Sequence, residues 1–418
     1  MAMYTDIDEA ARHGDLDFIR DVLESEKILY LTEHSMDEAA AYGHLHVVQW
    51  LHENTPEGCT TAAMDQAAAN EHIHVVQWLH ENRREGCSTA AMDGAATRGD
   101  LDMVQWLHSC RHEGATTDAM DGAASNGHLH VVQWLHQYRA EGCSTKAMDG
   151  AATNGYLSVV QWLHANRLEK CTEEAIKGAI RYNYVDVVNF LLAHRYYNEA
   201  SLGLYLRFAA QCGHIELVHQ FAGGRDPEDI LLALDVAARC GHRECTWFLF
   251  QCVGRASPNA IDGAAAEGYL DVIEFLHSHG QPCTENALTK ASENGHTSVV
   301  AFLIQNRPEG CTPHAIEAAA ANGHLHVLQL LSQTPAQCTA QALRRAAAAG
   351  HSTVVDFLLA TYPNMEWPLK DSIKAAEING HRNIADNLEM EFVSSGLSKR
   401  LAVTDQGPLA SSNMLRSA

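Results

Sequence analysis

Histidine is the residue type in this sequence that could bind a metal or transfer a proton near neutral pH. The chain holds 26 histidines. Nine of them follow a recurring turn: His44, His72, His128, His214, His242, His296, His324, His351 and His381. The triplet His44-Leu45-His46 resembles a chelate only superficially, because no carboxylate or third ligand has a fixed spacing to it and structural zinc takes four ligands. We therefore expect structural histidines, with no metal site and no cofactor.

Cysteine is the second candidate for chemistry. Seven of the 12 cysteines recur at one position: Cys59, Cys87, Cys143, Cys171, Cys283, Cys311 and Cys338. Neighbouring members should lie one helix spacing apart, about 8–10 Å. A disulfide needs Cα atoms closer than about 7 Å. The pattern therefore predicts free, buried thiols in a reducing compartment.

Carboxylates form a third recurring file, six residues before the turn position: Asp37, Asp65, Asp93, Asp121 and Asp149. On a surface, such a file would suit a segment rich in Lys and Arg. The alternative is that each Asp accepts hydrogen bonds from amides of a neighbouring loop. Both interpretations are open at this stage.

A catalytic site is not predicted. The sequence has no set of nucleophile, base and oxyanion donors at a meaningful spacing, no phosphate-binding loop and no stretch left over for a catalytic domain. We therefore expect a protein that is not an enzyme.

These files exist because one stretch of sequence recurs along the chain. Its cleanest copy is 147–164, and the same frame stands at 119–136, 91–108 and 63–80. Fourteen copies follow one another at 27 to 30 residues when they are aligned on these turn positions: Gly14, Gly43, Glu71, Gly99, Gly127, Gly155, Asn183, Gly213, Gly241, Gly268, Gly295, Gly323, Gly350 and Gly380. Self-similarity at such a period is the signature of a repeat architecture.

Each copy predicts two helices. Most copies have Ser or Thr eleven residues before the turn position, where the side chain can accept from the free amides of a first helical turn. Pro258 and Pro313 follow this position directly, at the helical site that tolerates proline. The glycine ends the first helix, and the Leu-x-Val-Val-x-Trp-Leu-His stretch after it has the wide apolar face of a helix packed between neighbours.

The pattern Ala-Ala-x-x-Gly-His-Leu-x-Val-Val-x-x-Leu resembles the ankyrin repeat, and it is matched closely at 123–135, 264–276 and 319–331. The resemblance covers residues 5–390. The interval is near 28 residues, whereas ankyrin repeats have about 33, so the segment of the β-hairpin finger is shortened or absent. The resemblance implies an all-α, ankyrin-type solenoid of helix pairs over 1–390, with a weak point at 222–227. Residues 391–418 lose the pattern, and we expect a disordered C-terminal tail there.

The formal net charge is −23. Nucleic acids and anionic membranes select clustered Lys and Arg, so the charge argues against both partners. It permits a protein partner with a basic segment, although solubility explains the charge equally well. The N-terminus lacks a signal-peptide pattern and no run of 18 apolar residues occurs, which predicts a cytoplasmic or nuclear protein. We also expect a monomer.

The resemblance implies that first helices line a concave face and that this face, with its loops, binds a protein partner. Positions that vary between copies are candidates for specificity. Nine residues before the turn position these are Asp118, Lys146, Glu174, Asn259, Asn286 and His314. Two residues before it they are Arg181 and Arg239, and the carboxylate file adds Asp65, Asp93, Asp121 and Asp149. The alternative function is a structural spacer or elastic solenoid without one specific partner.

Overall fold

The computed structural model describes residues 4, 6–24, 32–307, 312–334 and 338–404, with side chains as far as Val393. Within these residues it contains 28 α-helices, one short 3-10 helix, η1 (Glu199–Ser201), and no strand. The all-α prediction is confirmed, and the described loops contain no hairpin fingers.

The α-helices form fourteen pairs, one for each copy of the repeat. The first helices are α1 (Ile7–His13), α3 (Glu33–Ala41), α5 (Thr61–Ala69), α7 (Thr89–Arg98), α9 (Thr117–Ser125), α11 (Thr145–Thr153), α13 (Glu173–Arg181), α15 (Leu202–Cys212), α17 (Pro227–Arg239), α19 (Pro258–Glu267), α21 (Glu285–Glu293), α23 (Pro313–Ala321), α25 (Ala340–Ala349) and α27 (Leu369–Ile378). The second helices are α2 (Leu16–Glu24), α4 (Leu45–Asn54), α6 (Ile73–Asn82), α8 (Leu101–Cys110), α10 (Leu129–Tyr138), α12 (Leu157–Asn166), α14 (Val185–Ala193), α16 (Ile215–Ala222), α18 (Arg243–Val253), α20 (Leu270–Ser278), α22 (Thr297–Asn306), α24 (Leu325–Leu331), α26 (Ser352–Thr361) and α28 (Arg382–Thr404).

The helix ends follow from local sequence. The Thr60 hydroxyl accepts a hydrogen bond from the backbone N–H of Ala62 at 3.0 Å and so caps α5. Pro258 is the first residue of α19, where its missing N–H costs no helical hydrogen bond. Gly99 ends α7 in the left-handed conformation, with φ at 89°, and its N–H donates to Ala95 and Ala96.

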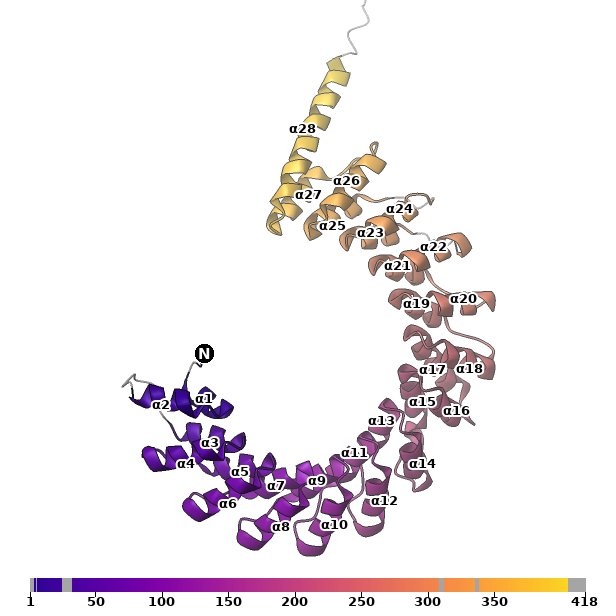
Figure 1. The fold of residues 1–418 in the computed structure, drawn as a ribbon. Coiled ribbons are helices and arrows are strands. Elements are labelled where there is room, and N and C mark those ends of the chain that lie inside the picture. The colour runs from indigo at the N-terminus through magenta and orange to yellow at the C-terminus, as the bar shows by residue number, and fades with distance from the viewer. Residues whose placement is uncertain (1–3, 5, 25–31, 308–311, 335–337, 405–418) are drawn as a thin grey trace, which may run out of the picture. The chain divides into compact units, whose positions relative to one another are not determined.

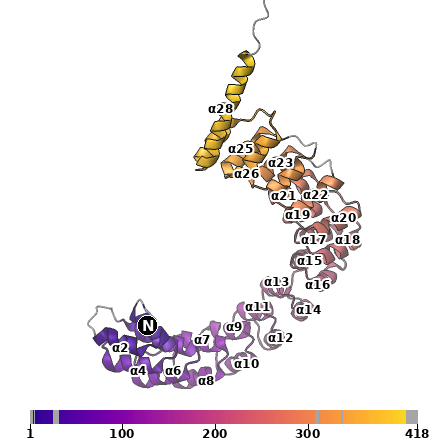
Figure 2. The same ribbon diagram turned by 45° about the horizontal axis from the view of Figure 1, so that its top comes forward.

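Contacts divide the chain into two compact units, residues 1–208 and residues 209–418, with the boundary inside α15. In the first unit, the first helices pack on one another from α1 to α13, and the second helices form a parallel row with fewer mutual contacts (Figure 1). In the second unit, the first helices α17 to α27 form such a row beside α18 to α26 (Figure 2). Within each unit the first helices lie on the inner side of the curve.

The core between the helix rows repeats with the sequence. In the third copy, Met64, Ala67 and Ala68 of α5 and Val75 and Leu79 of α6 are all at most 1% exposed. Alanine lets neighbouring first helices approach closely, whereas Val and Leu fill the wider space beside the second helices. Each helix pair therefore buries its apolar faces only by stacking on its neighbours.

Two predictions of organisation concern segments where the repeat ends or breaks. The helix α28 continues to Thr404, beyond the predicted start of the tail at 391, and residues 405–418 lie outside the described residues. The loop at 222–227 connects α16 to α17, and its weakness stays a prediction. No helix of the described residues has the length and apolar character to cross a membrane.

Candidate functional site

The recurring aspartates connect each repeat to the next. Asp37 accepts two hydrogen bonds from Thr60, one from the backbone N–H at 2.8 Å and one from the hydroxyl at 2.7 Å. The same two bonds join Asp65 to Ser88, Asp93 to Thr116, Asp121 to Ser144, Asp149 to Thr172 and Asp262 to Thr284. We call these pairs the Asp ladder. Since Thr60 also caps its own helix, one carboxylate fixes both the loop and the start of the next first helix.

The environment of the Asp ladder is largely enclosed. Asp65 is 8% exposed and Asp121 is 4% exposed. Burial raises the pKa of Asp93 and Asp149, while the hydrogen bonds from Thr116 and Thr172 oppose that rise. The aspartates thus accept hydrogen bonds from the neighbouring loop, as one of the two interpretations of this file expects. A contact between the ladder and a partner stays a prediction.

The histidines that follow the turn position form a second connection between repeats. The ring of His44 lies on Gly14 of the preceding repeat, and a Cβ atom on that glycine would be 2.6 Å from the ring. Nε2 of His44 is 3.0 Å from the carbonyl oxygen of Arg12. Tyr156, Tyr184 and Tyr269 take the same position over Gly127, Gly155 and Gly241. The described residues contain no group of three potential ligands that could hold a metal.

A third connection runs along the second helices. His52 packs edge-on against Trp78 of the next repeat, with ring centroids 5.2 Å apart, and its Nδ1 is 3.0 Å from Nη1 of Arg83. Arg83 also pairs with Glu85. The unit recurs, and in its last copy the hydrogen bond with Arg167 lowers the pKa of Glu169.

This third connection changes character after α14. By its place in the repeat Arg195 corresponds to Arg83 and Arg167, but it adopts a positive φ of 56°. Its place at the preceding histidine is taken by Tyr196, whose hydroxyl is 2.7 Å from Nδ1 of His164. The recurring tryptophans of α4 to α12 are half-buried and lie at the edge of the core: Trp50, Trp78, Trp106, Trp134 and Trp162.

The described cysteines are all free thiols. Burial raises the pKa of Cys59 and Cys87 to about 11 and that of Cys171 to about 12. Such thiols are protonated at neutral pH, and the thiolate is the nucleophilic form. These positions therefore have the environment of structural cysteines.

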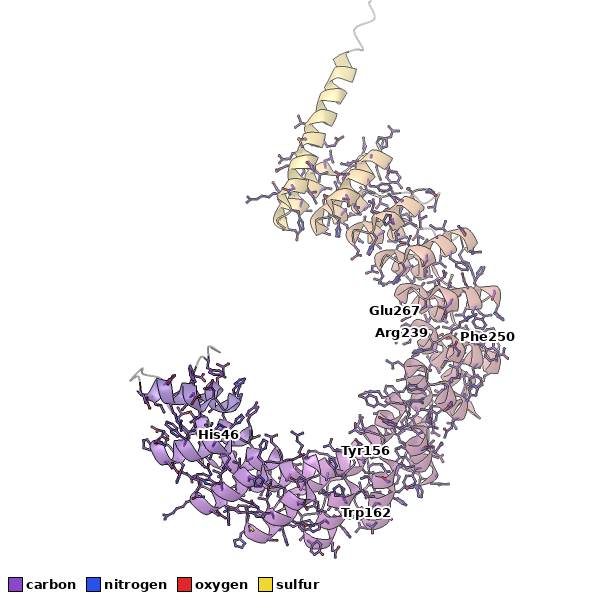
Figure 3. All side chains as sticks on the ribbon, viewed as in Figure 1. His46, Tyr156, Trp162, Arg239, Phe250 and Glu267 are labelled. Carbon is purple, nitrogen blue, oxygen red and sulfur yellow. The ribbon has the colours of Figure 1, made fainter. Side chains whose placement is uncertain are left out.

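The candidate residues nine positions before the turn form an exposed file on the first helices. Its members are Asp118, Lys146, Glu174, Asn259, Asn286 and His314, and each is exposed. Figure 3 shows Arg239 and Glu267 on the same first-helix side of the second unit and Phe250 on the side of the second helices. We call the exposed surface of the first helices the first-helix face.

The candidates two positions before the turn have a contact that the sequence interpretation missed. Arg181 is exposed, and its guanidinium carbon is 5.7 Å from the centre of the Phe208 ring in the next first helix. The Cβ of Arg239 would be 3.0 Å from a Cβ on Gly263. In other copies small residues face each other here, for example Ala69 and Gly94. This position thus sets the approach of neighbouring helices as well as the surface.

Comparison with known families identifies the repeat. Models described as ankyrin repeats match residues 36–80, 64–108 and 119–164 in the first unit and residues 261–342 in the second. The chain is an ankyrin-repeat protein. A comparison with curated proteins finds no match.

Two solved structures of another helical-repeat protein also match. They are crystal structures of the pentatricopeptide repeat protein PPR10 in complex with an 18-nt RNA element, one of them of a triple cysteine-to-serine variant. The variant has a TM-score of 0.38 and 8% identity and covers 93% of this chain and 73% of its own. The other structure has a TM-score of 0.33 and 9% identity and covers 93% and 79%.

These matches correct the exclusion of nucleic acid that the net charge suggested. The matched chains come from complexes of a helical-repeat protein with RNA. In addition, a net charge summed over 418 residues does not describe the charge of any single face. We therefore do not retain the exclusion. At these TM-scores the likeness does not identify a partner for this chain.

Proposed function

We propose that this chain is a non-catalytic scaffold that binds a protein partner along its first-helix face. The proposal is supported by the ankyrin repeats in both units. Its main observation is the contrast between two files on the same helices. On α9, α11 and α19 the ladder position is an aspartate bonded to the next repeat, whereas the exposed file on the same helices changes from Asp118 to Lys146 and Asn259.

This contrast separates residues that hold the repeats together from residues that are available to a partner. A residue that stabilises stacking is constrained to one chemistry, but an exposed residue can differ from copy to copy without loss of folding. Interfaces obtain specificity from such varied polar groups on a rigid frame. The compartment, cytoplasm or nucleus, and the monomeric state stay predictions.

The test is a comparison of two triple variants of the full chain. The first variant carries Asn259→Ala, Asn286→Ala and His314→Ala on the first-helix face. The second carries Glu274→Ala, Gln305→Ala and Gln329→Ala on exposed positions of the second helices. We expect only the first variant to lose partners captured from the source lysate, with both variants retaining the melting temperature of the wild type.

A structural spacer is the second candidate function. It is favoured by the near-identical copies at 30–168, in which the Asp ladder continues without interruption from Asp37 to Thr172. A spacer needs equal links and no varied face. Equal capture by both triple variants would support the spacer and oppose the scaffold.

A further inference from the structure

The last helix differs from the other second helices in its length. α28 has 23 residues, whereas the other second helices have 7 to 11. Its first turns pack on the last repeat, since Ile384, Ala385 and Leu388 are at most 4% exposed. The side chains of residues 389–393 are all exposed. α28 therefore leaves the helix stack after Leu388, and Figures 1 and 2 both show it running past α27.

We call residues 389–404 the projecting segment. At a rise of 1.5 Å per residue, these residues span about 24 Å. Isolated helices of about this length are marginal in water, and Gly396 lowers the helix propensity of this one further. The projecting segment therefore gains stability when another surface packs on it.

An apolar stripe runs along the projecting segment. Met390 is 65% exposed and Val393 is 59% exposed. Leu397 and Leu401 continue the stripe in the sequence, because steps of three and four residues stay on one side of a helix. By the same periodicity, buried Leu388 is on the opposite side of α28. The apolar stripe is thus separate from the core, at the end of a solenoid where a polar surface is expected.

The two halves of α28 carry opposite charges. Residues 382–393 have a formal charge of −2, from Arg382, Asp386, Glu389 and Glu391. Residues 394–404 have a formal charge of +2, from Lys399 and Arg400. A second α28 in the antiparallel direction would place each acidic half beside a basic half. In the parallel direction, like charges would face each other, which is unfavourable.

We propose that two copies of this chain associate through their projecting segments, which pack antiparallel with the apolar stripes in contact. With the helices centred near Ser394, Glu389 of one copy comes beside Lys399 of its partner. Small residues stand at this centre, Ser394, Ser395 and Gly396, and the distance between packed helices depends on the side chains at the contact. This inference goes beyond the scaffold function and is an alternative to the expected monomer.

The contact is small for a protein interface. Each copy contributes a single helical segment, so the buried area is below the roughly 800 Å² per partner of a standard interface. We therefore expect a reversible dimer with a dissociation constant in the micromolar range. The competing occupant of the stripe is the end of the same chain, residues 405–418, which would give a monomer at every concentration.

The experiment is sedimentation equilibrium of the full chain from about 1 µM to about 200 µM, the range in which micromolar association is populated. We expect the average mass to rise with concentration from 45.8 kDa, the mass of one chain, toward twice that value. Circular dichroism of each variant described below serves as the control for folding.

A pair of variants assigns the apolar contact. Met390→Gln with Val393→Gln should raise the dissociation constant by about tenfold or more, because apolar area would no longer be buried, while glutamine preserves helix propensity. Ile378→Gln is the matched control, since Ile378 is 74% exposed at the end of α27. Lys370 at the start of α27 lies 5.5 Å from the Phe392 ring, so Ile378 is at the opposite end from the projecting segment and its substitution should leave association unchanged.

Charge exchange tests the antiparallel direction. Glu389→Lys alone and Lys399→Glu alone should each raise the dissociation constant by about fivefold to tenfold, because each places like charges together twice in a symmetric pair. The two substitutions combined in one chain restore opposite charges across an antiparallel contact. We expect the combined variant to return to within about threefold of the wild type.

A mass of one chain at every concentration would overturn the proposal. It would also be overturned by a dimer that persists in the Met390→Gln and Val393→Gln variant, because another surface would then hold the copies together. Loss of association in the combined charge variant, with its melting temperature unchanged, would contradict the antiparallel arrangement.

Discussion

The imidazole of His128 lies directly on the α-carbon of Gly99, so that a Cβ atom on this glycine would be 2.4 Å from the ring. Gly99 also has a φ of 89°, which side chains other than glycine rarely adopt. Glycine is therefore required at position 99 for two separate reasons: its own backbone conformation and the ring of the next repeat that lies on it. Substitutions can separate the two.

Gly99→Ala should lower the free energy of unfolding by more than Gly254→Ala. Both positions have a positive φ, which costs about 1–2 kcal/mol for alanine, but nothing lies within 4 Å of a Cβ on Gly254. Only Gly99→Ala must also displace a ring. Urea unfolding of the two variants measures the difference, and equal losses would show that the histidine moves without cost.

Glu71→Gly should stabilise the protein by about 1 kcal/mol. Glu71 has a φ of 68°, so Glu71 itself adopts the left-handed conformation of the turn. The preceding residue, Asn70, has a φ of −106° and does not adopt it. Removing a side chain from this conformation relieves strain. A neutral or negative change in the urea midpoint would contradict the assignment.

The repeat after Glu71 predicts a coupling with this position. In other copies a His or Tyr follows the turn position, and its ring lies on the turn glycine of the preceding repeat. Asp100 stands at this position after Gly99, and its side chain instead caps α8 by accepting from the N–H of Met103 at 2.9 Å. A ring there would meet the Cβ of Glu71. We expect Asp100→His to destabilise the wild type more than the Glu71→Gly variant, which a double-mutant cycle measures. Additive effects would mean that the two positions do not meet.

Asp121→Ala should cost about 2–3 kcal/mol, because it leaves the N–H and hydroxyl of Ser144 without their acceptor. Asp118→Ala in the same helix is the matched control, since Asp118 is exposed, and it should change stability by less than about 0.5 kcal/mol. Thermal unfolding followed by circular dichroism compares the two. Similar losses would contradict the structural role of the Asp ladder.

Acid should destabilise the repeats through the histidines of the turn. Burial lowers the pKa of His72 and His128 below 6.5. Well above pH 6.5 the ring is neutral in both the folded and the unfolded chain, so its full contribution to the free energy of unfolding is present. As the pH falls below 6.5 the unfolded chain binds the proton first, and stability is lost until the folded pKa is passed.

His72→Tyr with His128→Tyr tests this pH dependence, because tyrosine is the residue that the chain itself uses at Tyr156 and Tyr184. We expect the double variant to lose less stability than the wild type between pH 7 and pH 5, measured by urea unfolding at each pH. An unchanged slope would show that other groups control the acid response.

Thiol reactivity should follow burial. At mildly alkaline pH, exposed Cys252 should react with an alkylating reagent before Cys59, whose pKa is raised to about 11, and Cys171, whose pKa is raised to about 12. Mass spectrometry of partly alkylated protein gives the order. Equal rates in denaturant serve as the control, and rapid reaction of Cys171 in the folded chain would contradict the described packing.

The fold was accessible from the sequence because its elements are local and repeated. The position seven residues before the turn is aliphatic or Met in every copy, and Met64, Met92 and Met148 of that position are buried. Caps such as Thr60 and terminators such as Gly99 fixed the helix ends from neighbouring residues alone. The exposed file was also predictable, since its members vary while the core positions do not.

The role of the Asp ladder was less accessible, because Asp65 and Ser88 are 23 residues apart and no local rule connects them. A signal did exist within the chain. Where Lys177 and Arg207 replace the aspartate, Leu202 and Ile230 replace the Ser or Thr of the following cap, although Thr289 replaces the aspartate in a copy whose following cap, Thr312, is retained. The contact of Arg181 with Phe208 gave no comparable pattern, since it occurs once.

The central claim is that partners contact the first-helix face and not the second helices. A photo-cross-linking residue placed at Asn259 in one variant and at exposed Glu274 in another tests it in the same repeat. After irradiation in source lysate, the account predicts one or more discrete protein adducts from position 259 and none of these from position 274. The same adducts from both positions, or adducts from 274 alone, would contradict it.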